Sequence, residues 1–500
     1  MPLDALPYDV KELILSALDS PKDLLRLALT SKSWKSLVIP HHIEYRLLRL
    51  DDHRPEVWKH LAEKRLLASR IRTVVLGPDY RLLPGVGQSQ SSLYPRTLLS
   101  TPTSEAAQIK DVQVVREDVL QALRNMTSLV SFSLHLEYDP ECPLQPLPGD
   151  PFAGKEIVQA LKESKSLRKV SISDLGNKIF SCGLKHHEAE VGLEDVLWAF
   201  RDLEELSTTI PFPKLTAAVK AVQPMSNLRR LCIRPGTYHL SSDFLSYTFP
   251  HLHTFDLNVF PFGEPEVWDQ PVIEFLSRHP TIEVLEWQTL YQTRPPRLSR
   301  TLLPNLKVIR SNHKFVLGIV ASGGERPLTE IHDLGLDEQA FAILFRERRA
   351  LTSVRCITVA HAFNYGLFLR LGSIFPSLEV MYLRPDQPGA FSLDDFAMTA
   401  SHFPSLRCLP TVSVLFKASQ KETLVRNLLA ACSTLTWVTA ICERSGDQEA
   451  RSYLVQLQPE RWEEIDNPAA GCKFPNVSPR PEGFGLLVDY RAPLVQIGDQ

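Results

Sequence analysis

The 500-residue sequence predicts a mixed α/β fold, in which a short helical segment precedes a long body of stacked helix–turn–strand units. The template L-x-x-L-x-L, with other apolar residues allowed, recurs along the chain, often at a spacing of 24 residues. A segment with helical periodicity precedes most copies. Such units are expected to place parallel strands on one face and helices on the other, because no single unit can bury its own apolar face.

The first 50 residues have the apolar periodicity of helices. A first helix is expected from Pro7 to Leu18, since proline suits the first helical turn and a stripe of apolar residues follows. A second helix restarts at Pro21, and a third helical stretch is expected from Pro40 to Leu50. So short a segment makes a poor independent core, and part of its apolar surface is expected to need a partner.

An ordered set of short motifs in this segment resembles the F-box family. The motifs are Leu6-Pro7, Ile14-Leu15, Leu18, Asp23-Leu24-Leu25, Leu27-Ala28, Ser31-Lys32, Trp34 and Leu37. The resemblance implies docking onto the Skp-type adaptor of a cullin-based ubiquitin ligase, through Leu6, Pro7, Ile14, Leu15, Leu18, Leu24 and Leu27. By the same analogy, Trp34 and Leu37 hold the helices together. The alternative is that residues 1–50 only cap the array that follows.

Copies of the template run through most of the remaining chain. Their first residues are Ile71, Leu129, Leu167, Leu203, Leu228, Leu252, Ile282, Leu306, Val354, Leu378, Leu406 and Leu435, with a weak copy at Leu328. Helices are expected before many of them, at residues 117–125, 155–163, 193–200, 271–278 and 421–431. A proline or serine turn often follows the helix, and proline there ends the helix and starts an extended segment.

This pattern is similar to the degenerate leucine-rich repeats found behind F-boxes, notably in large fungal families. The asparagine that normally follows the strand is missing from nearly every copy, so an irregular leucine-rich-repeat-like solenoid is expected. The domain assignment is an F-box at 1–50, a repeat body at 51–460 with loop insertions at 77–110 and 138–152, and a tail or cap at 461–500. The competing fold is a closed or doubly wound α/β enzyme.

Composition limits the classes of function. Lys plus Arg number 55 against 58 Asp plus Glu, a net charge of -3 that argues against a general nucleic-acid binder. The eight cysteines form no C-x-x-C pair, which indicates reduced thiols and a cytoplasmic or nuclear location. No run approaches the ~18 apolar residues of a membrane span, and the longest, residues 315–321, has the length of a strand. No membrane association is therefore expected.

The motifs of common enzymes are missing from the sequence. It contains no P-loop, no G-x-S-x-G elbow and no H-E-x-x-H, and Gly85-Val86-Gly87 lacks the third glycine of a dinucleotide site. His186, His187, Glu188 and Glu190 are adjacent rather than one helical turn apart, so a solvated loop is expected instead of a metal site. Cys232, Cys356 and Cys408 fall at strand positions, where a structural role is expected. The sequence therefore predicts neither catalysis nor a cofactor.

A target protein is expected to bind the open face of the sheet, where the residues between the inward-pointing apolar positions lie. The candidate residues are Arg230, Arg234, Arg310, Tyr382, Arg384 and Trp437. Exposed arginine and aromatic residues are typical of interaction hot spots. The four arginines recur at related positions, which suggests an acidic or phosphorylated partner. An ordinary solvated strand face is the alternative explanation.

The function predicted from the sequence is a substrate-recognition adaptor of a Skp–cullin–F-box ubiquitin ligase. Its head binds the Skp-type adaptor, and through it a cullin, while its body binds a target protein. Two alternatives stay open. The first is an interaction scaffold that uses a Skp-type partner outside any ligase, and the second is an α/β enzyme whose catalytic residues are assembled from distant parts of the chain.

Overall fold

The structure, a computed structural model, describes most of the N-terminal segment and the repeat body. The described residues are 6–18, 21–50, 55–76, 112–136, 155–174, 200, 202–208, 225–233, 245–258, 266–288, 298–362, 365–383, 401–417, 426, 430, 432, 434, 437–443, 451–456 and 464–465. The expected insertions at 77–110 and 138–152, the histidines at 186 and 187, and nearly all of the tail at 461–500 lie outside them.

Sixteen strands of the described chain form one sheet, in which each strand lies beside its neighbours in sequence. Strands β1 to β14 pair in parallel, whereas β15 and β16 pair antiparallel. The strands are β1 (Leu47–Leu50), β2 (Thr73–Leu76), β3 (Ser131–Leu136), β4 (Lys169–Asp174), β5 (Glu205–Thr208), β6 (Arg230–Ile233), β7 (Thr254–Asn258), β8 (Val284–Gln288), β9 (Val308–Ser311), β10 (Glu330–Leu336), β11 (Cys356–Ala362), β12 (Val380–Leu383), β13 (Cys408–Lys417), β14 (Trp437–Glu443), β15 (Arg451–Gln456) and β16 (Glu464–Ile465).

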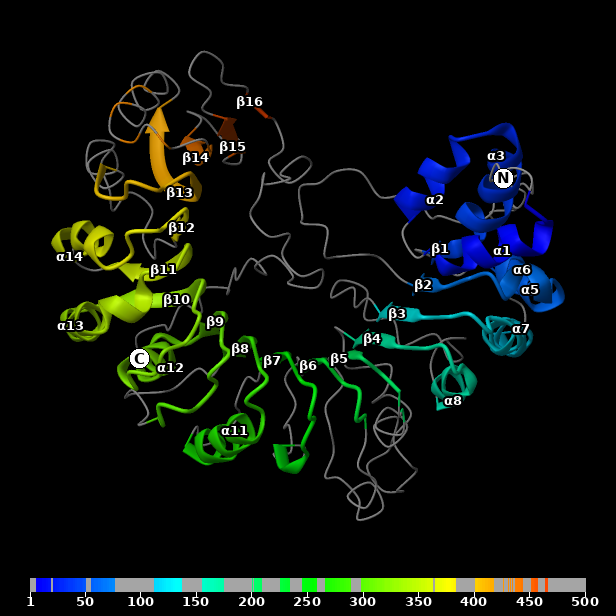
Figure 1. The fold of residues 1–500 in the computed structure, drawn as a ribbon, viewed down its shortest axis with the longest axis horizontal. Coiled ribbons are helices and arrows are strands. Elements are labelled where there is room, and N and C mark those ends of the chain that lie inside the picture. The colour runs from blue at the N-terminus through cyan, green and yellow to red at the C-terminus, as the bar shows by residue number, and fades with distance from the viewer. Residues whose placement is uncertain are drawn as a thin grey trace, which may run out of the picture.

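The sheet bends into an arc, with the strands on its inner side and the helices of the body on its outer side (Figure 1). The helices of the body are α5 (Pro55–Glu63), α6 (Arg65–Ala68), α7 (Val112–Asn125), α8 (Lys155–Glu163), α11 (Glu266–Arg278), α12 (His313–Ala321), α13 (Glu338–Arg346) and α14 (Tyr365–Arg370), with 3₁₀ turns at Arg348–Leu351 and Leu371–Ser373. None of the described helices is long and apolar enough to cross a bilayer.

Alternation along each strand explains the layering. In β7, Phe255 and Leu257 are fully buried and face the helices, and Phe255 pairs in register with Leu285 of β8. Equivalent residues of the repeats that lead into β2 to β13 join one continuous apolar core that extends from Tyr45 to Cys432. Each repeat buries its apolar residues against the next one, so the stability of the body comes from stacking.

Hydrogen bonds between neighbouring repeats have a recurring form. Two consecutive backbone N–H groups donate to one carbonyl of the preceding repeat, as Arg229 and Arg230 do to Glu204 at 2.8 and 3.0 Å. A second recurring bond comes from the residue just before the first template position. The Thr281 hydroxyl donates to the Leu252 carbonyl and the Ser353 hydroxyl to the Leu328 carbonyl, both at 2.8 Å. These hydroxyls satisfy carbonyls at the turns that precede the strands.

The helical head differs from the expected three helices in its boundaries. It contains α1 (Tyr8–Ala17), α2 (Pro21–Ala28) and α3 (Lys32–Val38), followed by a π-helical turn at Ile39–Ile43 and the short α4 (Glu44–Arg46). The expected third helical stretch from Pro40 to Leu50 is confirmed as far as Arg46 and is wrong beyond it, because Leu47–Leu50 forms β1 and pairs with β2. Leu48 and Leu50 are buried against the first repeat, which favours a strand over a helix here. The alternation of two buried and two half-buried residues is also that of a strand.

The apolar run at 315–321 has the length of a strand but lies in helix α12. The Asn312 side chain accepts a hydrogen bond from the Phe315 N–H at 3.0 Å and caps this helix. Residues 315–320 are all buried, so the helix is apolar on every side and shows no stripe. The sequence pattern could not separate this helix from a buried strand.

The expected positions of the strands are confirmed. Each template copy, including the weak one at Leu328, ends in a strand of the parallel sheet. The expected helices at 117–125, 155–163 and 271–278 lie in α7, α8 and α11. Those at 193–200 and 421–431 lie almost entirely outside the described residues. Strand β15 departs from the repeat pattern, since it turns back antiparallel to β14 near the end of the expected body.

Candidate functional site

The apolar residues of helix α2 and of the turn after it form one buried stripe and one exposed stripe, about 100° apart around the helix axis. Leu24 and Ala28 are buried in the head's own core, whereas Leu25 and Leu29 are 47% and 76% exposed. Both pairs are four residues apart, so each forms a stripe on one side of the helix. Exposed leucines at this spacing on a short helix are suited to contact with another protein.

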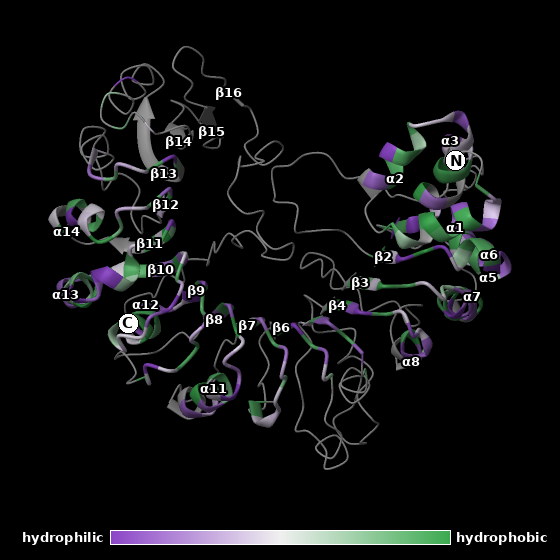
Figure 2. Ribbon diagram, in the orientation of Figure 1, coloured by the Kyte–Doolittle hydropathy of each residue, from purple (hydrophilic) through white to green (hydrophobic). Residues whose placement is uncertain are grey.

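Helix α1 shows the same division. Leu15 is fully buried, and Ile14 and Leu18 pack partly against the same core. Leu13 is 70% exposed and Val10 38% exposed, at positions three residues apart. Figure 2 shows hydrophobic residues on all three helices of the head. The head thus encloses a small core and still presents apolar side chains outward.

Trp34 and Leu37 hold the three helices together, as expected from the sequence. Both are buried, and Trp34 is only 1% exposed. The backbone N–H of Trp34 donates to the Ser31 hydroxyl at 3.2 Å, so Ser31 caps α3. The Lys11 ammonium of α1 lies 5.5 Å from the centre of the indole ring, within reach of a cation–π contact.

Polar contacts hold the segments of the head together, and one of them reaches the first repeat. The buried Arg46 donates to the Leu15 carbonyl at 3.1 Å. Glu12 lies 3.0 Å from His42 and 3.5 Å from Arg70 of the body. Burial raises the pKa of Glu12, but the Tyr8 hydroxyl, His42 and Arg70 outweigh it and leave that pKa below its ordinary value.

Burial also lowers the pKa of His42, more than Glu12 raises it. A lowered pKa favours the neutral imidazole, so the contact between His42 and Glu12 is best described as a hydrogen bond. In the same cluster, the Tyr8 hydroxyl donates to Glu12 at 2.7 Å. The head is therefore anchored to the body and has a defined orientation on it.

The structure places the predicted adaptor-binding residues in three different environments. Leu15 and Leu24 are fully buried inside the head, so the predicted contact of these two side chains with an adaptor is not supported. Leu6, Ile14, Leu18 and Leu27 are half-buried, and Pro7 is exposed. The large exposed apolar residues of the head include others that the resemblance did not name as contacts: Tyr8, Val10, Leu13, Leu25 and Leu29.

On the open face of the sheet, charged residues of neighbouring strands pair with one another. Arg310 of β9 lies 3.5 Å from Glu286 of β8 and 3.8 Å from Asp333 of β10. The Arg310 side chain is only 12% exposed, and the Glu286 side chain 5%. One strand further, the Cys232 thiol donates to the buried Asp256 carboxylate at 3.0 Å. This part of the face is an internally paired network.

These contacts revise the predicted target face. Arg310 is engaged with two carboxylates, so it does not contribute to a free basic surface. Arg230 is half-buried in β6, and Tyr382 packs against a small cluster of Cys356, Val380 and Cys408. Arg234 and Arg384 lie outside the described residues, and Trp437 is described only as the first residue of β14, opposite Cys408.

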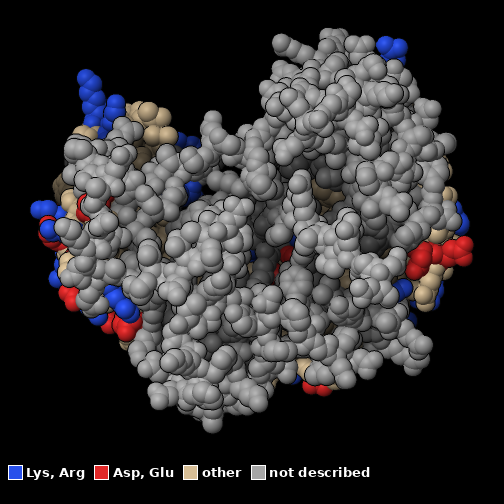
Figure 3. Space-filling model, turned by 180° about the vertical axis from the view of Figure 1, so that it is seen from behind, with Lys and Arg blue, Asp and Glu red and all other residues tan. Residues whose placement is uncertain are grey.

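The surface seen from behind shows no field of one sign in its described part. Basic and acidic side chains both occur at its left and right edges (Figure 3). Ion pairs join neighbouring strands at the edge where the strands begin, as between Lys169 and Glu205 at 2.6 Å and between Lys307 and Glu283 at 2.8 Å. The described surface therefore gives no support to an acidic or phosphorylated partner.

A polar groove follows the starts of strands β10 to β13. Its volume is about 670 Å³, and its lining is Thr329, Glu330, Ser353, Arg355, Cys356, Ser377, Glu379, Val380, Pro404, Ser405, Arg407 and Thr434. Arg355 and Glu379 of adjacent repeats approach within 3.7 Å. This groove was not predicted from the sequence. The signal that could have found it is the serine or threonine before the template position, at residues 353, 377, 405 and 434.

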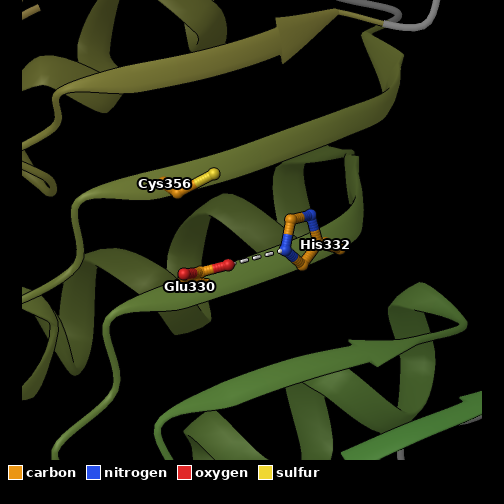
Figure 4. A group of neighbouring side chains, drawn as sticks. All are labelled: Glu330, His332 and Cys356. Carbon is orange, nitrogen blue, oxygen red and sulfur yellow. Dashed lines mark hydrogen bonds and ion pairs between the residues drawn. The ribbon is translucent and has the colours of Figure 1, made fainter. Parts of the chain in front are cut away.

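Three potential metal ligands lie at one side of this groove. Atoms of Glu330, His332 and Cys356 that could bind a metal ion all lie within 4.8 Å of one another (Figure 4). Burial is the main reason that the pKa of His332 lies below its ordinary value. The imidazole also has a hydrogen bond at each nitrogen, at 2.8 Å to the Thr358 hydroxyl and at 3.3 Å to the Glu330 carboxylate.

The fold and the head together define a class of protein, in which a small helical domain with outward apolar residues is fixed to one end of a parallel αβ repeat body. The family comparison then identifies the head. Residues 3–47 match the F-box-like family, so the chain carries an F-box-like domain that ends where β1 begins. No curated protein matches the chain.

Proposed function

We propose that this protein is the substrate-recognition adaptor of a Skp–cullin–F-box ubiquitin ligase. The F-box-like match at residues 3–47 is the observation that carries the proposal. The outward leucines of α1 and α2 supply the apolar surface that a Skp-type adaptor would cover. The cytoplasm or the nucleus, where thiols stay reduced, would be the location.

The body is proposed to be a degenerate leucine-rich-repeat solenoid that holds the target protein. The parallel strands in chain order, the outer helices and the single continuous core all support this assignment. The hydroxyl groups before the template positions join neighbouring repeats, because they hydrogen-bond to carbonyls of the preceding repeat. Degeneracy of the repeat is therefore compatible with regular stacking.

The target is proposed to bind the inner side of the arc, with the groove at β10 to β13 as part of its contact. The groove presents side chains of both charges, including Arg355, Glu379 and Arg407, together with several hydroxyls. Such a surface suits a polar protein segment with both donors and acceptors. The protein itself would make and break no bond, and its contribution would be to raise the effective concentration of a target lysine near the ubiquitin-carrying enzyme.

An α/β enzyme is the less favoured proposal. A cysteine–histidine pair would need a ring nitrogen of His332 directed at the Cys356 thiol. Thr358 and Glu330 already hydrogen-bond to the two ring nitrogens, so His332 is not placed as the base for that thiol. An interaction scaffold that uses a Skp-type partner without a cullin is the closer alternative.

Co-expression of the full chain with a Skp-type adaptor and its cullin, followed by affinity purification and size exclusion, tests the proposal. A single complex that contains all three proteins is the expected result. Recovery of the chain with the adaptor alone, under conditions in which a known F-box protein captures the cullin, would favour the scaffold. If the chain is folded but neither the adaptor nor the cullin is recovered with it, the head acts neither in a ligase nor in a scaffold.

A further inference from the structure

The Glu330, His332 and Cys356 cluster is built from two adjacent strands. Glu330 and His332 are alternate residues of β10, so both side chains emerge on the open face of the sheet. Cys356 begins β11 and pairs in register with Glu330. The sheet therefore brings a carboxylate, an imidazole and a thiol together without any contribution from a loop.

A bulge in β10 shapes this cluster. The register with β11 shifts between Ile331 and Leu334, which inserts an extra residue opposite β11. Asp333 in the bulge adopts a left-handed backbone with φ of 59°. Its carboxylate reaches Arg310 at 3.8 Å, on the same open face as His332. The Asp333 carboxylate thus pairs with Arg310, while the Glu330 carboxylate hydrogen-bonds to His332.

The imidazole is oriented as in known metal sites. Metal-binding histidines commonly hydrogen-bond through the second ring nitrogen to a neighbouring group that fixes the orientation of the ring. The Thr358 hydroxyl, 2.8 Å from His332 Nδ1, is such a group. Nε2 lies 3.3 Å from Glu330 Oε2. In Figure 4 the Glu330 carboxylate and the Cys356 sulfur lie on one side of the imidazole.

The distances suit a small tetrahedral ion. With bonds of about 2.0–2.3 Å, neighbouring ligand atoms of bound zinc lie about 3.3–3.8 Å apart. The 3.3 Å between His332 Nε2 and Glu330 Oε2 already has this value, and no pair of ligand atoms is separated by more than 4.8 Å. Small side-chain rotations would bring all three to one ion.

The cluster is buried at Cys356 and His332 and partly exposed to water at Glu330. Cys356 is 7% exposed and the His332 side chain 12%, whereas the Glu330 side chain is 32% exposed. Glu330 and Cys356 also line the polar groove. A metal ion held here would face the groove at its remaining coordination position.

We propose that Glu330, His332 and Cys356 form a three-ligand zinc site that opens onto the groove. A thiolate, an imidazole and a carboxylate are all established zinc ligands, and zinc takes four. Water from the groove completes the coordination. Binding replaces the Cys356 S–H bond with a sulfur–zinc bond and releases one proton to solvent. The proposal concerns the body of the protein and does not depend on the function of the head.

Titration of the metal-free full chain with Co²⁺ under reducing conditions, followed by competition with Zn²⁺, tests this assignment. One equivalent of Co²⁺ should give thiolate-to-cobalt charge-transfer absorption, and Zn²⁺ should abolish it. Cys356→Ser should remove the absorption, and His332→Gln should weaken metal binding more than tenfold. Thr358→Val, which removes only the orienting hydroxyl, should weaken it by about tenfold.

Cys408→Ser is the matched control, because Cys408 is equally buried at the start of β13 and belongs to the same small cluster but lies two strands away. It should leave the cobalt spectrum unchanged. Circular dichroism of each variant establishes that it is folded. No charge-transfer band in the folded wild-type chain, or equal losses in Cys356→Ser and Cys408→Ser, would overturn the zinc site.

Discussion

The head and the body of this protein differ in how far their apolar side chains are buried. In the head, helices of no more than ten residues bury Leu15 and Leu24 while leaving Leu13 and Leu29 at 70% and 76% exposure. In the described body, the inward residues of the parallel strands, such as Phe255, are fully buried. The parallel strands of the body thus bury their inward residues against the body's own helices, whereas the proposed function gives the exposed leucines of the head a partner protein.

Hydrogen bonds join neighbouring repeats along the described body, whereas the head is attached to the body at one end (Figure 1). Neighbouring repeats of the body are joined by paired backbone donors and by side-chain hydroxyls at the turns. The head is joined to the first repeat by the ion pair of Glu12 with Arg70 and by the pairing of β1 with β2. Substitutions should therefore affect stability in the body and association in the head.

The largest difference in the free energy of unfolding is expected between the variants Phe255→Ala and Leu13→Ala. Phe255 is fully buried, and its ring centre lies 4.6 Å from that of Phe275 in α11. Its truncation leaves a cavity between sheet and helix and should lower the free energy of unfolding by about 3–5 kcal/mol. Leu13 is mostly exposed, so its truncation should change that free energy by less than about 0.5 kcal/mol.

Urea denaturation of both variants, followed by circular dichroism, measures the difference. Leu66→Ala is a control for an exposed leucine outside the head, since Leu66 is 82% exposed in α6. A loss of stability in Leu13→Ala as large as that in Phe255→Ala would contradict the division between the two regions.

A smaller effect on the free energy of unfolding is expected from substitution of His279, which links two repeats of the body. Its Nε2 accepts a hydrogen bond from the Phe249 N–H at 2.8 Å, and Nδ1 lies 2.6 Å from the Phe275 carbonyl. A backbone N–H can only donate, so Nε2 carries no proton and the neutral ring is the stable form. Burial lowers the pKa of His279 from 6.5 to about 4.

The lowered pKa implies a pH-dependent stability. The contribution of His279 is fully present above pH 6.5, the pKa in the unfolded chain, and is lost as the pH falls toward about 4. The loss over this range is about 3 kcal/mol at most. His279→Gln, which keeps a donor and an acceptor without titrating, should show a smaller loss of unfolding free energy between these pH values. Parallel curves for wild type and variant would contradict the assignment.

Much of the body could be predicted from the sequence, because the L-x-x-L-x-L template records the inward residues of each strand directly. Even the weak copy at Leu328 leads into β10. The prediction failed where a helix and a strand are compatible with the same pattern of apolar residues. Leu47–Leu50 continues a helical spacing but pairs with β2, and the apolar run at 315–321 has no stripe because α12 is buried on all sides.

The candidate sites were harder to predict, because they depend on contacts between residues distant in sequence. The resemblance named Leu15 and Leu24 as contacts, but a family motif does not separate residues that build the core from residues that face a partner. Arg310 was taken for an exposed cation, yet the bulge in β10 supplies its partner Asp333. Nothing in the sequence marks Arg326 as buried, although it donates to several backbone carbonyls, including those of Leu302 and Ile319.

The central claim is that the outward face of the head, and not its core, binds a Skp-type adaptor. Its most direct test is the dissociation constant of the full chain and a purified Skp-type adaptor, measured by calorimetry for wild type, Leu13→Asp, Leu25→Asp and Leu66→Asp. We expect wild type and Leu66→Asp to bind equally, and each head variant to bind more than tenfold more weakly while it stays folded. Undiminished binding by both head variants, or no binding by the wild-type chain, would contradict the account.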